Sequence, residues 1–371
     1  MIGAGPAGSA AASVLAARGH RVLLLEKDRL PRRKVCGEFL SGRAREGLER
    51  LGVLPAVEAI AVPIRGGALH LASGRAIPFP LPAPALGISR FALDSLLARR
   101  AAELGVELRC GARVLGVARE GGGFRVRWAG AGGSEPGEAS AAVIVGAWGR
   151  WDALDRALER RFGRERARYL GWSADYATDG TGTFANDVRL YVFPGGYCGL
   201  SPVEGGRAHL AGVISERARR RLAPGWPAVV AHARLANRAL DRDLARLGAE
   251  EGEALGTGPV YFTRKPPVSD GVILTGDAAG VLDPFSGEGQ ASALASGLLA
   301  GDAAARALGS VSGAGTLAAD YAREWRRRFG RRFAWSAAFR RLVLSPRLAD
   351  AAAGLAGRTL MGLAVRKIAG P

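Results

Sequence analysis

The glycine spacing at the start of the chain constrains its fold more than any other feature. Gly3, Gly5 and Gly8 follow a G-x-G-x-x-G pattern, a helix of small residues comes next, and the strand over 21–25 ends at Glu26. In this pattern the first glycine permits a tight turn, the second lets the backbone approach a pyrophosphate, and the third lets the helix pack closely on the strand. An acidic residue about 20 positions further on binds a ribose. The pattern therefore predicts a βαβ unit that binds a dinucleotide.

The strand before this glycine turn is short. Only Met1 and Ile2 precede Gly3, whereas a strand usually has about 5–6 residues. We therefore expect an upstream segment that would complete the strand.

A second pattern typical of ligand binding lies far along the chain. The apolar run Val272–Leu274 leads into Gly276-Asp277-Ala278-Ala279-Gly280 and then Asp283-Pro284-Phe285-Ser286-Gly287-Glu288-Gly289-Gln290, before a long helix rich in Ala, Gly and Leu. A strand, a Gly-Asp turn and a helix N-terminus present a carboxylate and free backbone N–H groups to a polyhydroxylated, anionic ligand. We expect the two glycine-rich stretches to hold one long cofactor from both sides.

The periodicity between these stretches predicts a discontinuous α/β organisation. Ser89 caps an amphipathic helix, four strand-like runs follow up to Val145, and residues 155–267 are mainly β-hairpin material with one helix near 227–247. We predict a Rossmann-type cofactor domain with a β-rich substrate domain inserted and a helical C-terminal cap. The predicted bounds are 1–62 with 88–154 and 268–312, then 63–87 with 155–267, and finally 313–371.

Composition excludes several classes of protein. The chain has 371 residues, of which 48% are hydrophobic and 23% charged, as expected of an ordinary globular protein. Cys36, Cys110 and Cys198 form no C-x-x-C pair and the four histidines are scattered, so we expect no metal site and a reducing cytoplasm. No apolar run reaches the roughly 20 residues that a membrane-spanning helix requires.

The net charge of +18 comes almost wholly from arginine. Either the composition is biased toward arginine, or a basic face meets anionic lipid or an acidic partner. No nucleic-acid-binding pattern accompanies the charge, so nucleic acid is not an expected partner. The arginine run over 323–332 has aromatic residues nearby, which leaves open a peripheral membrane contact through the C-terminal helix.

The motifs together resemble a known family. The glycine turn with Glu26-Lys27, the Lys34-Val35-Cys36-Gly37-Glu38 loop, Ser89-Arg90 with Asp94, and the Gly276–Gly289 stretch are similar to the geranylgeranyl-reductase branch of FAD-dependent oxidoreductases. That branch belongs to the para-hydroxybenzoate-hydroxylase-like superfamily. The resemblance covers roughly residues 1–305 and implies FAD as the cofactor.

The resemblance also implies roles for individual residues. Gly3, Gly5 and Gly8 would lie at the pyrophosphate, and Glu26 with its neighbour Lys27 at the adenosine ribose. The remaining cofactor-binding positions that it implies are Arg90 near the phosphates, Val114 at the adenine through its backbone, Asp277 at the ribityl chain or pyrophosphate, and Pro284, Gly287 and Gly289 at the flavin edge. A helix dipole at that edge would stabilise the reduced, anionic flavin.

Cys36 is the candidate catalytic residue. In the reductases that this chain resembles, a cysteine in this loop lies near the flavin ring, where a thiol can donate a proton or act as a redox partner. The alternative is a small residue that only packs beside the ring. The residue type does not decide between the two.

Two departures from the family affect the expected substrate. Tyr197-Cys198-Gly199-Leu200-Ser201-Pro202 stands where prenyl reductases carry Tyr-x-Trp-x-Phe-Pro, so Tyr197 and Pro202 are the expected substrate-pocket residues while two aromatic side chains are missing. Gly146-Ala147-Trp148-Gly149 replaces the Ala-Asp-Gly that usually ends this strand. The pocket is therefore expected to differ from that of a geranylgeranyl reductase.

These features predict an FAD-dependent oxidoreductase in which NAD(P)H docks transiently and reduces the flavin. The expected reaction is C=C reduction in a hydrophobic small molecule, prenyl-like or polyketide-like. Two alternatives stay open: a monooxygenase that forms a flavin hydroperoxide, and a non-catalytic FAD-binding protein at a membrane surface.

Overall fold

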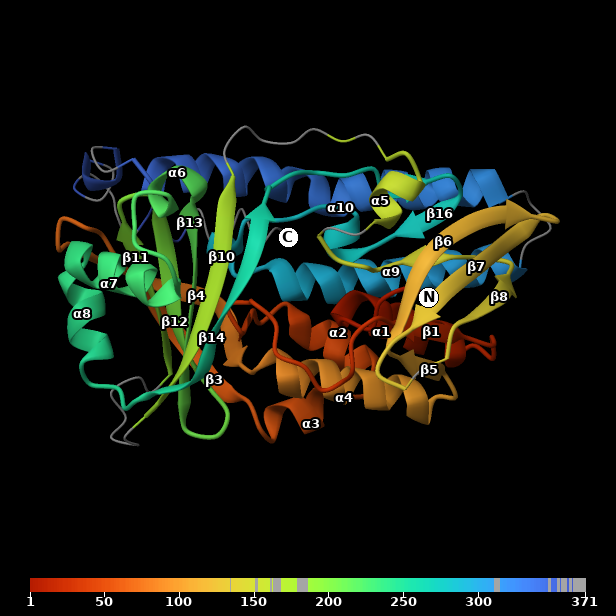
Figure 1. Cartoon of the computed structure of the whole chain (residues 1–371), viewed down its shortest axis with the longest axis horizontal. Helices are drawn as coiled ribbons and strands as arrows, with labels where there is room; N and C mark the ends of the chain where they lie inside the picture. The colour runs from red at the N-terminus through yellow and green to blue at the C-terminus, as the bar shows by residue number, and fades with distance from the viewer. Residues whose placement is uncertain are drawn as a thin grey trace.

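The computed structural model shows an elongated molecule with a cofactor-binding part and a β-rich part side by side (Figure 1). It describes residues 1–133, 135–150, 153–160, 162, 168–178, 186–309, 314–345 and 348–351, together with the single positions 354, 359 and 362. None of the helices among these residues is long and apolar enough to cross a bilayer.

The cofactor-binding part is built on short parallel strands covered by helices. Strand β1 (Leu23–Glu26) pairs in parallel with β5 (Glu107–Cys110), and β9 (Val145–Gly146), β16 (Val272–Leu274) and β15 (Val268–Ser269) form a neighbouring sheet. Ile2 bridges Leu25 on one side and Gly146 on the other, so the short first strand joins the two sheets. This is the βαβ arrangement that the glycine spacing predicted.

Helix α1 (Pro6–Ala16) packs closely against α9 (Gly289–Gly309). A Cβ atom on Gly297 would lie 2.3 Å from the carbonyl oxygen of Ala7, and one on Gly301 would lie 2.8 Å from Cβ of Val14. Glycine at both positions therefore allows the two backbones to approach each other. This contact brings the N-terminal turn and the Gly276–Gly289 stretch, which are far apart in sequence, to the same place.

The β-rich part is an 8-stranded sheet in the order β14-β10-β13-β12-β11-β3-β4-β2. Its strands are β2 (Phe39–Leu40), β3 (Val62–His70), β4 (Ala76–Gly87), β10 (Tyr169–Ala177), β11 (Asp187–Phe193), β12 (Gly196–Val203), β13 (Arg207–Ser215) and β14 (Glu250–Val260). Helices α7 (Trp226–Ala236) and α8 (Arg238–Leu244) lie on its outer side (Figure 1). Most strands of this sheet come from residues 63–87 and 155–267, and β2 comes from a segment that the prediction assigned to the cofactor domain.

The other elements complete the two parts. The helices are α2 (Ala44–Arg50), α3 (Leu54–Glu58), α4 (Arg90–Glu103), α5 (Leu154–Ala157), α6 (Glu216–Arg219) and α10 (Ala314–Val343), with short 3₁₀ turns η1 (Gly276–Ala278) and η2 (Pro284–Ser286). Strands β6 (Ala112–Glu120), β7 (Gly123–Gly130) and β8 (Gly137–Ala141) form an antiparallel sheet. Helix α10 runs beside both parts (Figure 1), and of the second helix expected after Pro346 only a few positions are among the described residues.

The structure differs from the sequence-based expectation at three elements. The helix expected near 227–247 is two helices, because Asn237 has extended backbone and its side chain caps α8 by accepting from the N–H groups of Ala239 and Leu240. The short β pieces expected over 63–87 are two long strands, and the alternate prolines of β4 are accommodated because only Leu86 and Gly87 pair with β2 on its outer side. Strand β8 was not expected, since its sequence is small and polar.

Candidate active site

The N-terminal turn has the geometry that a pyrophosphate-binding loop requires. Gly3 has φ +98°, and a Cβ atom there would lie 2.5 Å from the carbonyl oxygen of Ala147. Gly8 is buried, and a Cβ atom there would lie 1.8 Å from the carbonyl oxygen of Gly3. Gly3 and Gly5 line a large cavity, whereas Gly8 does not and serves the packing of α1 on the turn.

Glu26 lies at the end of β1 beside this turn. Its side chain is buried, and Oε2 accepts a hydrogen bond from the N–H of Ala4 at 2.7 Å. Lys27 and Val114 line the same cavity, and the pairing of β6 shifts register between Val114 and Gly116. A bulge of this kind leaves backbone groups unpaired, as a backbone contact to an adenine would require.

The Gly276–Gly289 stretch begins beside the N-terminal turn and lines a further part of the cavity. Gly287 has φ +66°, a left-handed conformation that favours glycine, and a Cβ atom there would lie 2.8 Å from the ring of Phe39. Asp277, Pro284 and the first residue of α9, Gly289, also line the cavity. Its volume is about 820 Å³, within the range of pockets that bury most of an organic ligand.

Three cationic side chains, Arg32, Lys34 and Arg90, line one wall of the cavity, and acids pair with the two arginines. Arg90 makes two hydrogen bonds of 2.7 Å to the buried carboxylate of Asp94, and Arg32 contacts Glu26 at 3.3 Å. Burial, helped by the nearby cations of Arg90 and Arg32, lowers the pKa of Lys34 to about 8. Such a wall suits an anion like a pyrophosphate, so the residues present fit the cofactor that the sequence motifs imply.

Cys36 lines the cavity in the loop that leads to β2. Its Sγ accepts a hydrogen bond from Nε2 of Gln290, the second residue of α9, at 3.4 Å. Arg32 and Arg33, which precede it, point elsewhere, to Glu26 and to Asp175. The thiol is thus held beside the helix end that the sequence assigned to the flavin.

Tyr197 connects the sheet to the Gly276–Gly289 stretch. It lines the cavity, its hydroxyl donates to Oδ1 of Asp283 at 2.6 Å, and its ring packs edge-on against Phe285. The other oxygen of Asp283 lies 2.5 Å from Nε of Arg340, on α10. The C-terminal helix therefore supports the wall of the cavity.

Pro202, the other expected substrate-pocket residue, does not line the cavity. Side chains alternate between the two faces of a strand. Tyr197, Gly199 and Ser201 of β12 face the cavity, and Pro202 lies on the opposite face of the strand. Gly199 and Ser201 are the positions where the prenyl reductases carry aromatic residues. Their small side chains leave this part of the cavity open.

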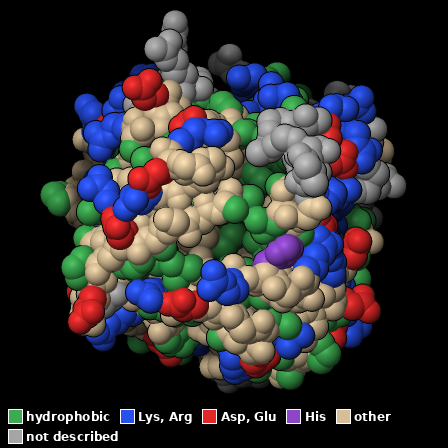
Figure 2. Space-filling view, turned by 90° about the vertical axis from the view of Figure 1, so that its right-hand side faces the viewer, with side chains coloured by type: hydrophobic (Ala, Val, Ile, Leu, Met, Phe, Trp, Pro, Cys, Tyr) green, Lys and Arg blue, Asp and Glu red, His purple; other side chains and the backbone are tan. Residues whose placement is uncertain are grey.

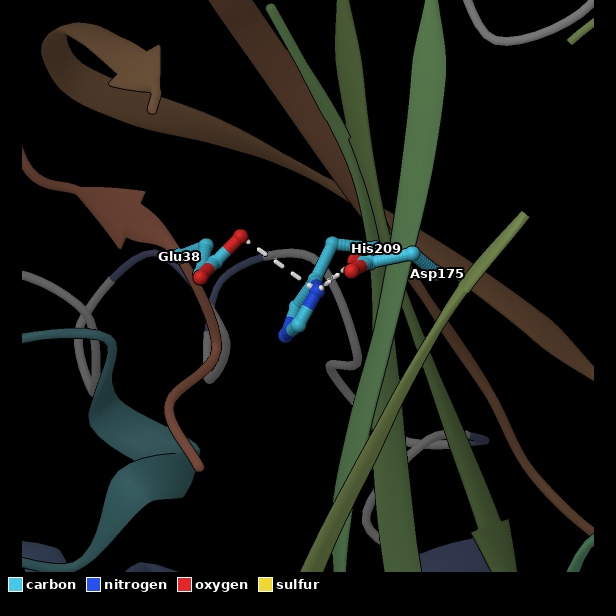
Figure 3. Close-up of side chains that lie close together, drawn as sticks. All are labelled: Glu38, Asp175 and His209. Carbon is cyan, nitrogen blue, oxygen red and sulfur yellow. Dashed lines mark hydrogen bonds and ion pairs between the residues drawn. The ribbon is translucent and has the colours of Figure 1, made fainter. Parts of the chain in front are cut away.

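A buried charged cluster lies behind the Cys36 loop (Figure 3). His209 contacts Asp175 at 2.5 Å and Glu38 at 3.3 Å through Nδ1, and its Nε2 lies 2.7 Å from the carbonyl oxygen of Cys36. Sequence reasoning missed this cluster and treated His209 as one of four scattered histidines. The available signal was an acidic residue, Asp175, within an otherwise apolar strand.

Three of the arginines of α10 pair with acids of the same helix. Arg323 pairs with Asp320, and Arg327 and Arg328 pair with Glu324. On the face shown in Figure 2, cationic and anionic side chains are likewise interspersed. A membrane contact through this helix stays a prediction.

The fold and the cavity define a class of protein, an α/β flavoprotein with a β-rich substrate domain. A family model described as an FAD binding domain matches residues 1–324, and the chain belongs to that family. It is an FAD-dependent enzyme of the oxidoreductase and monooxygenase kind, similar to the geranylgeranyl-reductase branch.

Named relatives support the same class. Digeranylgeranylglycerophospholipid reductase 2 of Methanopyrus kandleri is 29% identical over 80% of this chain and 74% of its own length. Kynurenine 3-monooxygenase of Salinispora arenicola is 29% identical over 79% of this chain and 69% of its own length. The solved structure of the flavin-dependent brominase Bmp2 superposes with a TM-score of 0.83 at 21% identity, covering 99% of this chain and 92% of that one, which shows a shared fold.

Proposed function

We propose that this chain uses NAD(P)H to reduce a carbon–carbon double bond in a hydrophobic, prenyl-like or polyketide-like molecule. The observation that carries the proposal is one continuous cavity with two kinds of wall. The glycine turns, Glu26 and the cations line one part, and apolar side chains from the sheet, η2 and α10 line another: Phe79, Leu81, Val188, Leu190, Phe285 and Phe339. A dinucleotide and an apolar substrate would share this space.

The family resemblance implies which residues would hold FAD, and their position in the cavity wall supports the assignment. The turn at Gly3 and Gly5 with the N-terminus of α1 would receive the pyrophosphate, Glu26 the ribose, and the N-terminus of α9 the flavin edge. Bound there, FAD supplies hydride chemistry. The net reaction adds one hydride and one proton across the double bond and converts NAD(P)H to NAD(P)⁺.

The protein would orient the reactants and supply the proton. The apolar wall excludes water from the substrate. Cys36 is the proposed proton donor, because its thiol lines the cavity and Gln290 fixes the position of Sγ. The alternative, that Cys36 only packs, is tested by Cys36→Ser, which would then leave the reaction rate unchanged.

Reductase chemistry is favoured over oxygenation by the Cys36 loop and by the name of the Methanopyrus kandleri relative. Monooxygenation is the second candidate, because the Salinispora arenicola relative is equally identical to this chain. Both require FAD, so cofactor content alone does not separate them.

The test begins with protein purified with its cofactor. FAD should be present at one per chain, and NADPH or NADH should bleach it in the absence of oxygen. Substrate-dependent oxygen consumption would favour the monooxygenase, and failure to take up FAD would refute both candidates.

A further inference from the structure

Three buried side chains from two parts of the fold meet behind the cavity wall (Figure 3). Glu38 is 5% exposed, Asp175 6% and His209 2%. Asp175 on β10 and His209 on β13 are direct partners across the sheet, whereas Glu38 is the last residue of the loop over 33–38, which contains Cys36. Two carboxyl groups therefore share one imidazole out of contact with water.

The hydrogen bonds of this cluster require a proton. Nδ1 of His209 faces both carboxyl groups, and Nε2 faces the carbonyl oxygen of Cys36. A carbonyl oxygen and a carboxylate can only accept hydrogen bonds. Both ring nitrogens of His209 therefore bond to these partners only when both carry a hydrogen. If the ring is neutral, one carboxyl must carry the proton instead, and the cluster holds one shared proton in either case.

The cluster contacts the loop over 33–38 at several points, and the contacts of His209 are the ones that need the shared proton. Arg33 contacts Asp175 at 2.7 Å, the Cys36 carbonyl contacts His209, and Glu38 contacts His209 with one oxygen and the N–H of Arg90 with the other at 3.0 Å. Between these anchors, Lys34, Val35, Cys36 and Gly37 line the cavity. Glu38 itself has φ +50°, a conformation that a non-glycine residue keeps only when its surroundings impose it.

The same three residues offer a nitrogen and two oxygens that could hold a metal ion. The distances favour a proton. Atoms bound to one tetrahedral zinc lie roughly 3.4 Å apart, whereas Nδ1 and Oδ1 of Asp175 are 2.5 Å apart, and the guanidinium of Arg33 already neutralises Asp175.

We propose that Glu38, Asp175 and His209 form a proton-dependent clamp that holds the Cys36 loop against the substrate sheet and releases it when the cluster loses its proton. His209 is a positioning residue: it acts through the loop and sets where Cys36 lies. The clamp deepens the proposed function and rests on it only for the chemical role of Cys36.

The direction of the pH dependence follows from the charges. Burial alone lowers the pKa of His209, but Glu38, Asp175 and the Cys36 carbonyl together raise it above its ordinary value. A raised pKa means that the clamp is complete below the ordinary histidine pKa and is lost as pH rises through the raised one. The other charges facing the cluster are Arg33 and the Glu204–Arg207 pair.

Hydrogen exchange of the FAD-loaded protein tests the clamp. Protection of the peptide over 33–39, corrected for the intrinsic pH dependence of exchange, is measured from about pH 6 to about pH 10. Wild-type protection should fall about tenfold with rising pH, as expected for loss of a charge-assisted hydrogen bond. His209→Gln should show low protection throughout, and His232→Gln, a histidine outside the cluster on α7, should match wild type.

Glu38→Gln makes the test independent of whether His209→Gln folds. It removes one charge that raises the pKa of His209, so the loss of protection should move to lower pH. Protection that stays flat with pH in wild type, an unmoved transition in Glu38→Gln, or a stoichiometric metal ion that survives chelation would each overturn the proposal. Exchange needs no turnover, so a protein that fails to use NAD(P)H but keeps the pH-dependent protection would refute only the proposed function.

Discussion

The hydroxyl of Tyr197 donates to Asp283 at 2.6 Å, and this bond joins strand β12 to the segment that leads into α9. Burial, followed by the adjacent carboxylate of Asp283, raises the pKa of Tyr197 far above its ordinary value, so the phenol keeps its proton. The same carboxylate is held by Arg340 of α10. The sheet, the loop that leads into α9 and the C-terminal helix therefore meet at one buried carboxylate.

Tyr197→Phe should destabilise the protein by about 1–3 kcal/mol, because the buried carboxylate of Asp283 loses one of its hydrogen-bond donors. Denaturant unfolding measures the change. Tyr321→Phe is the matched control: its hydroxyl donates to the Leu274 carbonyl at 2.6 Å, and the residue does not line the cavity. Both variants should lose stability, but only Tyr197→Phe should slow the reaction with substrate, and equal rates in the two would contradict this role.

Glu26→Gln should raise the dissociation constant of FAD about tenfold, since a charged acceptor for the ribose is worth about 1.4 kcal/mol more than a neutral one. Quenching of flavin fluorescence reports the affinity. Glu107→Gln on the neighbouring strand changes an exposed acid and should have no effect. Equal affinity of the two variants would show that Glu26 does not bind the cofactor.

Gly8→Ala should cost about 3 kcal/mol or more, because its Cβ would lie 1.8 Å from the Gly3 carbonyl oxygen and backbone must move. Gly289→Ala, whose Cβ would meet nothing within 4 Å, should be close to wild type in stability. Thermal unfolding of both variants without added FAD separates packing from binding. Comparable melting temperatures would contradict the proposed packing role of Gly8.

FAD affinity should fall as pH rises above about 8, where the buried Lys34 loses its proton. An anionic ligand binds more tightly when Lys34 carries its positive charge. FAD affinity therefore falls as the lysine loses its proton with rising pH. Lys34→Gln should bind FAD more weakly at neutral pH and show no step near pH 8. A step of unchanged size in the variant would assign the titration to another group.

The N-terminal turn and the position of Glu26 beside it were predictable from sequence because their determinants are local. The spacing of Gly3, Gly5 and Gly8 sets the turn, and the strand that follows places Glu26 next to it. The glycines of α9 that pack on α1 were not singled out, although they bring the two stretches together. Whether each predicted residue binds FAD stays a prediction for the experiments above.

The wall of the substrate cavity was less predictable because it depends on pairing between distant segments. Tyr197 and Pro202 stand an odd number of positions apart, so alternation along a strand already places them on opposite faces, whereas the face that meets the cavity depends on how distant segments pair. The meeting of Glu38 with Asp175 and His209 likewise needs the whole sheet to form. Arg33 was expected in the loop, but its partner lies on β10.

Anaerobic turnover tests the central proposal most directly. FAD-loaded protein is first reduced with NADPH or NADH and then mixed, without oxygen, with each compound of a set of prenyl-like and polyketide-like molecules that contain a carbon–carbon double bond. We predict that the flavin colour returns at the rate at which the compound gains two hydrogens, as measured by mass spectrometry. Return of the colour only when oxygen is admitted, with the compound unchanged, would contradict double-bond reduction as the function of this chain.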